Sequence, residues 1–335
     1  MDGLSRSAMA PDDTLIRKRQ SVFSLSTRSS VDYYGLLTKC GGPLLRAMSD
    51  RRGLHEFVCL MKCGMDDIAC QMRCGDLYEE DVLKEFHICA ISEHQVIPQR
   101  IDRHAAEGRV RDDQGKSEQV ARQLPGASEV DRRIPVVAAL EPAALQGEWW
   151  VVYGLNPVFD CFPCQHHTAS VVKSAPGKTS EAVRSDDGAP HPIMRWKNGA
   201  WTAANGVRFD ISYRVPVPHG GDKQPFFTRH VEQVFFPHRS SPGVLRSHDP
   251  TYLHQSDDWY ILSADPERYF IVYYMGCNDA WCGYDGGVVY SRTPEPSQAT
   301  IDDVREALRC AGLSIVSMCP VDNACSLQSP LADRQ

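Results

Sequence analysis

The residues with the clearest potential for chemistry are the cysteines, of which the chain has 13. Four of them, Cys59, Cys63, Cys70 and Cys74, stand in the segment CLMKCGMDDIACQMRC. Four thiolates at this spacing could hold a zinc ion. The same symmetry suits nested disulfides, Cys59–Cys74 and Cys63–Cys70, because cysteines four residues apart share one helix face. The spacing alone leaves both alternatives open, while the grouping of so many cysteines favours disulfides in an oxidising compartment.

Two helices joined by a short loop would position these cysteines. After them, Leu77, Val82, Phe86 and Cys89 follow one helical stripe, which Pro98 ends. We therefore expect a Cys-rich helical module over residues 53–98. Residues 1–52 are polar and weakly periodic, which predicts a poorly ordered N-terminal segment with a short helix near residues 33–48.

The pattern changes twice beyond this module. Residues 99–135 are rich in Arg, Asp, Gln, Gly and Ser, which predicts a flexible linker. From residue 136, alternating or apolar runs predict strands. The segment 300–310 fits a helix with Ile301, Val304 and Leu308 on one face. We expect one mostly-β domain over residues 136–328 and a tail over 329–335.

Composition excludes several classes of protein. The chain has 335 residues, 24% of them charged, and a formal net charge of -7. A nucleic-acid-binding protein would normally show a basic face, so we expect no nucleic-acid partner. The sequence has no run of about 20 apolar residues, so we expect no transmembrane helix. We also recognise no secretory signal at the N-terminus.

The stretch GEWWVVYGLNPVFDCFPCQ, residues 147–165, is the most informative part of the predicted β domain. Its Gly-x-Trp before an alternating run resembles the first strand of a lipocalin barrel. The glycine allows close approach of the backbone, and Trp149 would plug the closed end below the ligand cavity. The resemblance implies an eight-stranded antiparallel barrel with a C-terminal helix packed against it.

Four ordered segments resemble the violaxanthin de-epoxidase family. They are GLNPVFDCFPCQ at residues 154–165, FFTR at 226–229, YLHQSDDWYIL at 252–262 and FIVYYMGCNDAWCGYDGGVVYSR at 270–292. The resemblance implies reduction of a xanthophyll epoxide, violaxanthin to antheraxanthin and zeaxanthin, with ascorbate as co-substrate and no metal. Such chemistry needs an acid in an apolar cavity, where a raised pKa keeps a carboxyl protonated.

The resemblance implies roles for particular residues. Asp257 would be the general acid, and Tyr274 and Tyr290 would orient the epoxide. Taken alone, Asp257 would more often belong to a solvated turn, and both tyrosines would be ordinary half-buried strand residues. Candidate substrate- or ascorbate-binding residues are Gln165, Asp160, His167 and Trp259. Candidate pH sensors are His167 and His248, since histidine titrates near mildly acidic pH.

The resemblance also implies a setting and partners. The location would be the thylakoid lumen of the chloroplast, with a xanthophyll substrate and peripheral contact with the thylakoid lipid surface. A homodimer is a candidate assembly, because two joined barrels would offer one long tunnel to a two-ringed substrate. The family also implies a disulfide between Cys164 and Cys325, which closes a very long loop.

The sequence departs from the family at several positions. Pro163 stands where the family has a second acid, and Ser170 replaces a histidine. The proximal cysteines are reduced to Cys40, and the expected partner of Cys89 is replaced near Val96. Additional cysteines are Cys161, Cys277, Cys282, Cys310 and Cys319, of which Cys277 and Cys282 flank a turn and could bridge each other.

These departures favour a paralogue of the plant-type enzyme and leave two alternatives for its function. A tautomerase would open the same epoxide to an allene without reduction, as in conversion of violaxanthin to neoxanthin. A non-enzymatic lipocalin would carry a carotenoid, since many proteins of this fold are carriers.

Overall fold

The computed structural model describes the larger part of the chain. The described residues are 31–63, 67–79, 81–101, 134–138, 140–172, 205–218, 226–238, 241–249 and 252–327. The predicted tail and most of the predicted linker lie outside these ranges. Within them, no helix is both long enough and apolar enough to cross a membrane.

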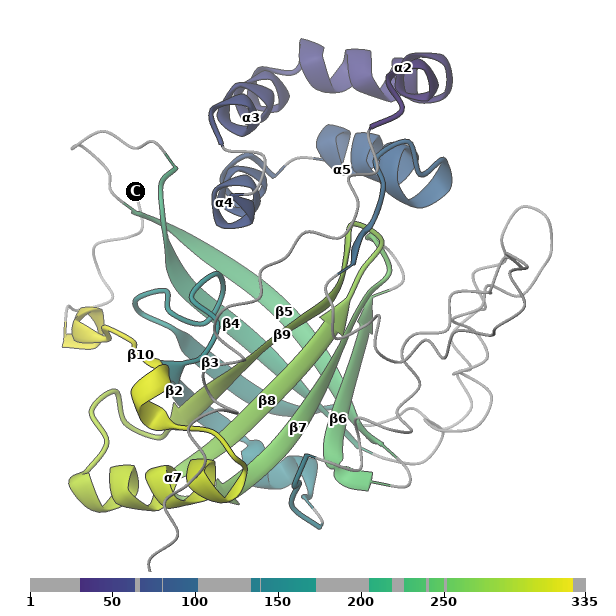
Figure 1. Cartoon of the computed structure of the whole chain (residues 1–335). Helices are drawn as coiled ribbons and strands as arrows, with labels where there is room; N and C mark the ends of the chain where they lie inside the picture. The colour runs from purple at the N-terminus through teal and green to yellow at the C-terminus, as the bar shows by residue number, and fades with distance from the viewer. Residues whose placement is uncertain are drawn as a thin grey trace, which may run out of the picture. The chain divides into compact units, whose positions relative to one another are not determined.

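The β domain is a closed antiparallel barrel of eight strands, as predicted (Figure 1). Each strand pairs with the next along the chain, and β9 returns to pair with β2. Two short strands extend the sheet, since β1 pairs in parallel with β9 and β10 pairs with β2. The bounds are β1 Arg100–Ile101, β2 Gly147–Gly154, β3 His166–Val172, β4 Gly206–Pro216, β5 Phe226–His238, β6 Ser241–Asp249, β7 Gln255–Asp265, β8 Tyr269–Cys277, β9 Trp281–Ser291 and β10 Cys319–Pro320.

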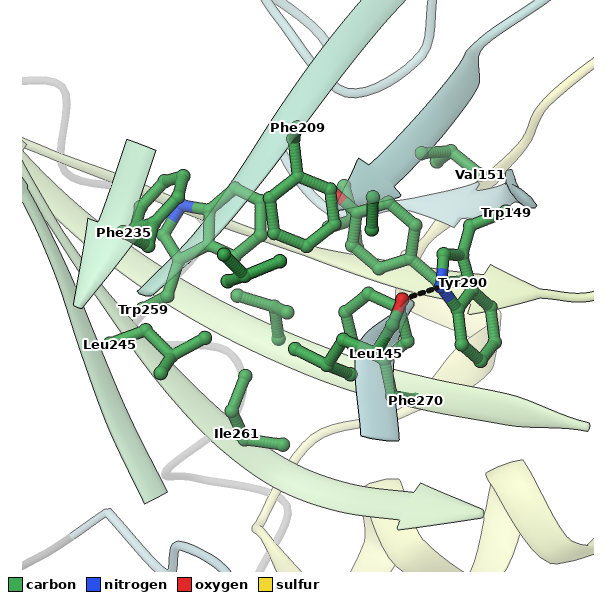
Figure 2. Close-up of a cluster of buried hydrophobic side chains, with 14 of the residues drawn as sticks. Leu145, Trp149, Val151, Phe209, Phe235, Leu245, Trp259, Ile261, Phe270 and Tyr290 are labelled. Atoms are coloured by element: carbon green, nitrogen blue, oxygen red, sulfur yellow. Dashed lines mark hydrogen bonds between the residues drawn. The ribbon is translucent and has the colours of Figure 1, made fainter. Parts of the chain in front are cut away.

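Trp149 fills one end of the barrel. Its indole Nε1 donates to the carbonyl of Leu145, 2.6 Å away in the 3-10 helix Pro142–Leu145, and its ring meets Phe270 edge-on (Figure 2). The guanidinium of Arg292 lies 3.5 Å from the centre of the indole ring. Gly147 has a φ of 107°, a conformation that favours glycine. The Gly-x-Trp motif therefore closes the barrel as its resemblance implied.

Helix α7, Gln298–Cys310, packs against the outside of the barrel (Figure 1). Ser297 caps its first turn by accepting a hydrogen bond from the backbone N–H of Thr300. Val304 and Leu308 are fully buried in a cluster with Tyr269, Ile271 and Val289 from the outer faces of β8 and β9. The outward-facing side chains of the barrel thus hold the predicted C-terminal helix.

The Cys-rich module contains four α-helices that disulfides join. They are α2 Tyr33–Ser49, α3 Arg51–Lys62, α4 Ile68–Tyr78 and α5 Asp81–His87, and α5 continues into a π-helical turn, Ile88–Glu93. The cysteines of α3 and α4 pair as Cys59–Cys74 and Cys63–Cys70, and Cys40 pairs with Cys89. These sulfurs are therefore not available as zinc thiolates.

The module begins earlier than we predicted. Helix α2 lies within residues 1–52, yet Cys40 and Ala47 are fully buried in one core with Leu83 and Phe86 of α5. The helix predicted near residues 33–48 is therefore present as α2, although Gly41-Gly42-Pro43 inside it weakens the helical pattern. The helical module therefore starts at Tyr33.

Candidate active site

The mouth of the barrel carries two adjacent rows of inward-facing residues on β7, β8 and β9. In the first row Asp257 pairs with Gly276, and Gly276 pairs with Tyr284. In the second row Trp259 pairs with Tyr274, and Tyr274 pairs with Gly286. Residues two apart on a strand point to the same face, so both rows face the barrel interior.

Asp257 accepts hydrogen bonds on both carboxyl oxygens. The hydroxyl of Tyr284 donates to Oδ1 at 2.7 Å. The amides of Gln255 and Gln233 donate to Oδ2 at 3.0 and 3.3 Å. Burial raises the pKa of Asp257 above its ordinary value, and the hydrogen bonds from Tyr284 and Gln255 offset part of that shift. The protonated form of Asp257 is therefore favoured more than that of a solvent-exposed aspartate.

Asp160 forms a second acid–tyrosine pair, on the loop between β2 and β3. The hydroxyl of Tyr274 donates to its Oδ1 at 2.8 Å. The backbone N–H groups of Asn156 and Gly287 donate to its Oδ2 at 2.8 and 3.1 Å. Burial raises the pKa of Asp160 to about 7, against the lowering effect of these hydrogen bonds. Asp160 is therefore also suited to hold a proton near neutral pH.

Glycine makes the room for each pair. A Cβ at Gly276 would lie 2.0 Å from the Tyr284 ring and 2.3 Å from Asp257 Oδ1. A Cβ at Gly286 would lie 2.2 Å from Tyr274 Oη and 2.7 Å from Asp160 Oδ2. In each row the tyrosine thus reaches its acid across a strand position that has no side chain.

Two disulfides attach the Asp160 loop to the C-terminal part of the chain. Cys161 is joined to Cys319, and Cys164 to Cys325. The second is the pair that the family resemblance implied, and the first involves two of the additional cysteines. Together they anchor the loop on both sides of Phe162, so the Asp160 backbone has little freedom to leave the barrel mouth.

Below the two acids the barrel interior is aromatic. Tyr290 is 1% exposed and stacks on Phe270, while Trp259 packs between Phe209 and Phe235 (Figure 2). The polar atoms of this cluster include the Tyr290 hydroxyl, the pKa of which burial and the charge of Asp160 raise. Polar groups at the mouth and aromatic rings below suit a long apolar ligand that has one polar end.

Comparison with known proteins identifies the family of this chain. The family described as "VDE lipocalin domain" matches residues 32–323. The chain belongs to the VDE lipocalin family. It is 30% identical to the chloroplastic violaxanthin de-epoxidases of Nicotiana tabacum and Spinacia oleracea, over 94% and 93% of its own length. It spans about half of those relatives, 56% in each case.

Solved structures with a related fold are more distant in sequence. The cockroach allergen Per a 4 is 15% identical, with a TM-score of 0.37 over 58% of this chain and 96% of the allergen. Lobster apocrustacyanin A1 is 13% identical, with a TM-score of 0.32 over 57% of this chain and 90% of its own.

The other predicted site residues of this VDE lipocalin domain contact groups near the two acids or in the aromatic cluster. His167 is buried against Tyr290, with 5.0 Å between ring centres, and burial lowers its pKa to about 3. The Gln165 amide lies 3.3 Å from the carbonyl of Phe159. On β6, His248 Nδ1 lies 3.1 Å from the carbonyl of Gln255. A pKa near 3 puts the titration of His167 below the mildly acidic range for which a sensing role was predicted.

Sequence reasoning missed Tyr284, Gln233 and Gln255, all of which bond to Asp257. The alternation along β9 could have identified Tyr284, because it shares parity with Tyr290 and must face the same side. Gln233 likewise pairs with Phe209, an interior residue. Gln255 carries the same signal, because it lies two residues before Asp257 on β7 and faces the same side.

Proposed function

We propose that this protein reduces xanthophyll epoxides, with Asp257 as the acid that protonates the epoxide oxygen and ascorbate as the reductant. The observation that supports this most directly is the buried Asp257 carboxyl, in a residue that is 6% exposed, at the mouth of an aromatic barrel in a chain of the VDE lipocalin family. The donors around this carboxyl are neutral, so the protonated acid can pass its proton to an ether oxygen without first breaking an ion pair. Tyr274 and Tyr290 would orient the reacting ring, with the polyene along the aromatic cluster.

A pigment assay tests this proposal. The oxidised protein is incubated with violaxanthin in galactolipid at mildly acidic pH, with and without ascorbate, and the pigments are analysed by mass. Loss of one oxygen only with ascorbate is the expected result. An isomer of unchanged mass without ascorbate would make the protein a tautomerase, and unchanged pigment that stays bound would make it a carrier.

The Asp257→Asn variant assigns the acid in this assay. It is expected to lower turnover by about 100-fold or more, because a positioned general acid typically contributes that much. Asp210→Asn is the matched control, since Asp210 is an exposed carboxylate on β4. A folded Asp257→Asn variant with wild-type turnover would refute the assignment.

We further propose peripheral contact with a lipid surface, through the helical module. Helix α2 exposes Tyr34, Leu37, Leu45 and Met48, which are 48–79% exposed and spaced along one stripe. Helix α3 exposes Leu54, Val58 and Met61 in the same way. Residues 33–62 contain five Lys or Arg residues, and their two acids are Asp50, which caps α3, and the buried Glu56. Apolar side chains beside basic ones are typical of helices that lie at an anionic membrane interface.

Vesicle flotation tests the lipid contact. Replacing Leu37 and Leu45 together by Gln is expected to weaken binding to anionic vesicles by about tenfold or more, because two buried side chains would be lost from the lipid. Val316→Gln is the control, since Val316 is 90% exposed near the C-terminal end of the barrel domain. Equal binding of both variants would exclude this surface.

The location in this proposal follows the relatives, which are named as chloroplastic, and the assembly follows the family resemblance of the sequence. We propose the thylakoid lumen, where disulfides and an acidic pH coexist. A homodimer is tested by sedimentation at neutral and mildly acidic pH, with association at acidic pH as the expected result.

A further inference from the structure

The two acid–tyrosine pairs are adjacent and constructed alike. Asp257 and Tyr284 share one row of the barrel mouth, and Tyr274 stands in the next row beside Asp160. Neighbouring same-face positions on a strand are about 7 Å apart. The charges of both Asp160 and Asp257 raise the pKa of Tyr274, which agrees with a position between the two carboxyls. Both acids therefore bond to tyrosines that stand in neighbouring interior rows of the barrel.

The proposed reaction needs two protons at one oxygen atom. The first proton lets one C–O bond of the epoxide break, which leaves a hydroxyl on the other carbon. The second proton lets that hydroxyl leave as water, as the second C–O bond breaks. Ascorbic acid supplies two electrons for the new C=C bond and becomes dehydroascorbate, and the two protons that it releases restore both carboxyls. One carboxyl cannot supply both protons without being reprotonated between the two steps.

We propose that Asp160 is the second proton donor, and that it protonates the hydroxyl formed after Asp257 has opened the epoxide. This inference rests on the proposed de-epoxidation. Tyr274 is the positioning residue of this second acid, because it holds Oδ1 while two backbone N–H groups hold Oδ2. The two disulfides beside Asp160 keep this carboxyl at the barrel mouth through both steps.

Product analysis of Asp160→Asn separates this role from that of Asp257. The full chain is incubated with violaxanthin and ascorbate, and substrate loss and oxygen loss are measured separately by mass. Asp257→Asn is expected to leave the substrate intact. Asp160→Asn is expected to consume the substrate but to form about 100-fold less de-epoxidised product, with ring-opened products that retain the oxygen in its place.

The outcomes distinguish this inference from the proposed function. A wild-type protein that removes no oxygen refutes both. If wild type removes oxygen and Asp160→Asn forms as much de-epoxidised product as wild type, only the role of Asp160 as second donor is refuted. An Asp160→Asn variant that consumes no substrate while keeping the wild-type near-UV circular dichroism also refutes it, because Asp160 would then act in the first step.

Tyr274→Phe gives a second test that keeps the carboxyl. Loss of a donor to Oδ1 raises the pKa of Asp160, so the pH above which oxygen-retaining products accumulate should increase. The fraction of these products at neutral pH is therefore expected to be lower than in wild type. An unchanged or higher fraction would contradict the proposal.

Discussion

At the scale of single residues, the two acids differ in what holds them. Side chains donate the hydrogen bonds described above to Asp257, whereas one tyrosine and backbone N–H groups hold Asp160. Side-chain donors can be removed one at a time without moving the main chain. The environment of Asp257 is therefore open to direct test by substitution, and Tyr284 is its shortest contact.

Tyr284→Phe is expected to shift the alkaline limb of the pH–rate profile to higher pH. The Tyr284 hydroxyl stabilises the ionised form of Asp257, so its removal raises the pKa of this carboxyl and keeps the acid protonated at higher pH. The measurement is initial rate against pH. Tyr269→Phe is the control, because its hydroxyl contacts Ser263 on the outer face. A limb that moves to lower pH would contradict the role of Tyr284.

At the scale of elements, the strands and α7 could be predicted because each has one buried face. The pairing within the site could not be predicted in this way. The family resemblance put Tyr274 beside the reacting centre, but only the register of β7, β8 and β9 shows that Tyr274 bonds to Asp160 and Tyr284 to Asp257. Register depends on contacts across strands, and no periodicity along one strand contains that information.

Gly276→Ala is expected to abolish turnover and to lower the free energy of unfolding by about 1–3 kcal/mol, the usual cost of overpacking. The added Cβ would overlap both the Tyr284 ring and the Asp257 carboxyl. Chemical denaturation and the pigment assay measure the two effects. Gly41→Ala in α2 is the control, because no atom lies within 4 Å of its Cβ position and alanine favours helix. Wild-type turnover in Gly276→Ala would show that the pair tolerates displacement.

At the scale of the whole molecule, the cysteine count is accounted for. Twelve cysteines form six disulfides, and Cys310 on α7 is free and exposed. Thiol titration of the native protein is expected to find one reactive thiol per chain, and none in Cys310→Ser. Four or more reactive thiols together with bound zinc would restore the metal alternative.

Stability should depend on pH through the buried acids. The folded-state pKa is raised to about 7 for Asp160 and Glu56 and to about 6 for Asp76. The stabilisation that each group contributes is fully present below its unfolded pKa and is lost as pH rises toward the folded value. The lowered pKa of His167 and His87 acts in the opposite sense, since it costs stability as pH falls below the unfolded value.

Asp160→Asn isolates one of these contributions. Its unfolding free energy relative to wild type is expected to increase as pH rises from about 4 to about 7. Over that range the carboxyl of wild type is protonated when folded and ionised when unfolded, so unfolding releases a proton in wild type only. Denaturation curves at several pH values measure the difference. A difference that is constant over this range would mean that Asp160 is already ionised at pH 4 in the folded state.

The disulfides that hold the Asp160 loop also set an order of events during biosynthesis. A ribosome releases Cys161 and Cys164 long before Cys319 and Cys325, since the separations are 158 and 161 residues. Until nearly the whole barrel has emerged, Cys161 and Cys164 must remain thiols. If they form a disulfide with each other, that disulfide must be reduced or exchanged. These two disulfides therefore form only once the strands between their cysteines are available, and an oxidoreductase that reshuffles disulfides would raise the yield of the native pairing.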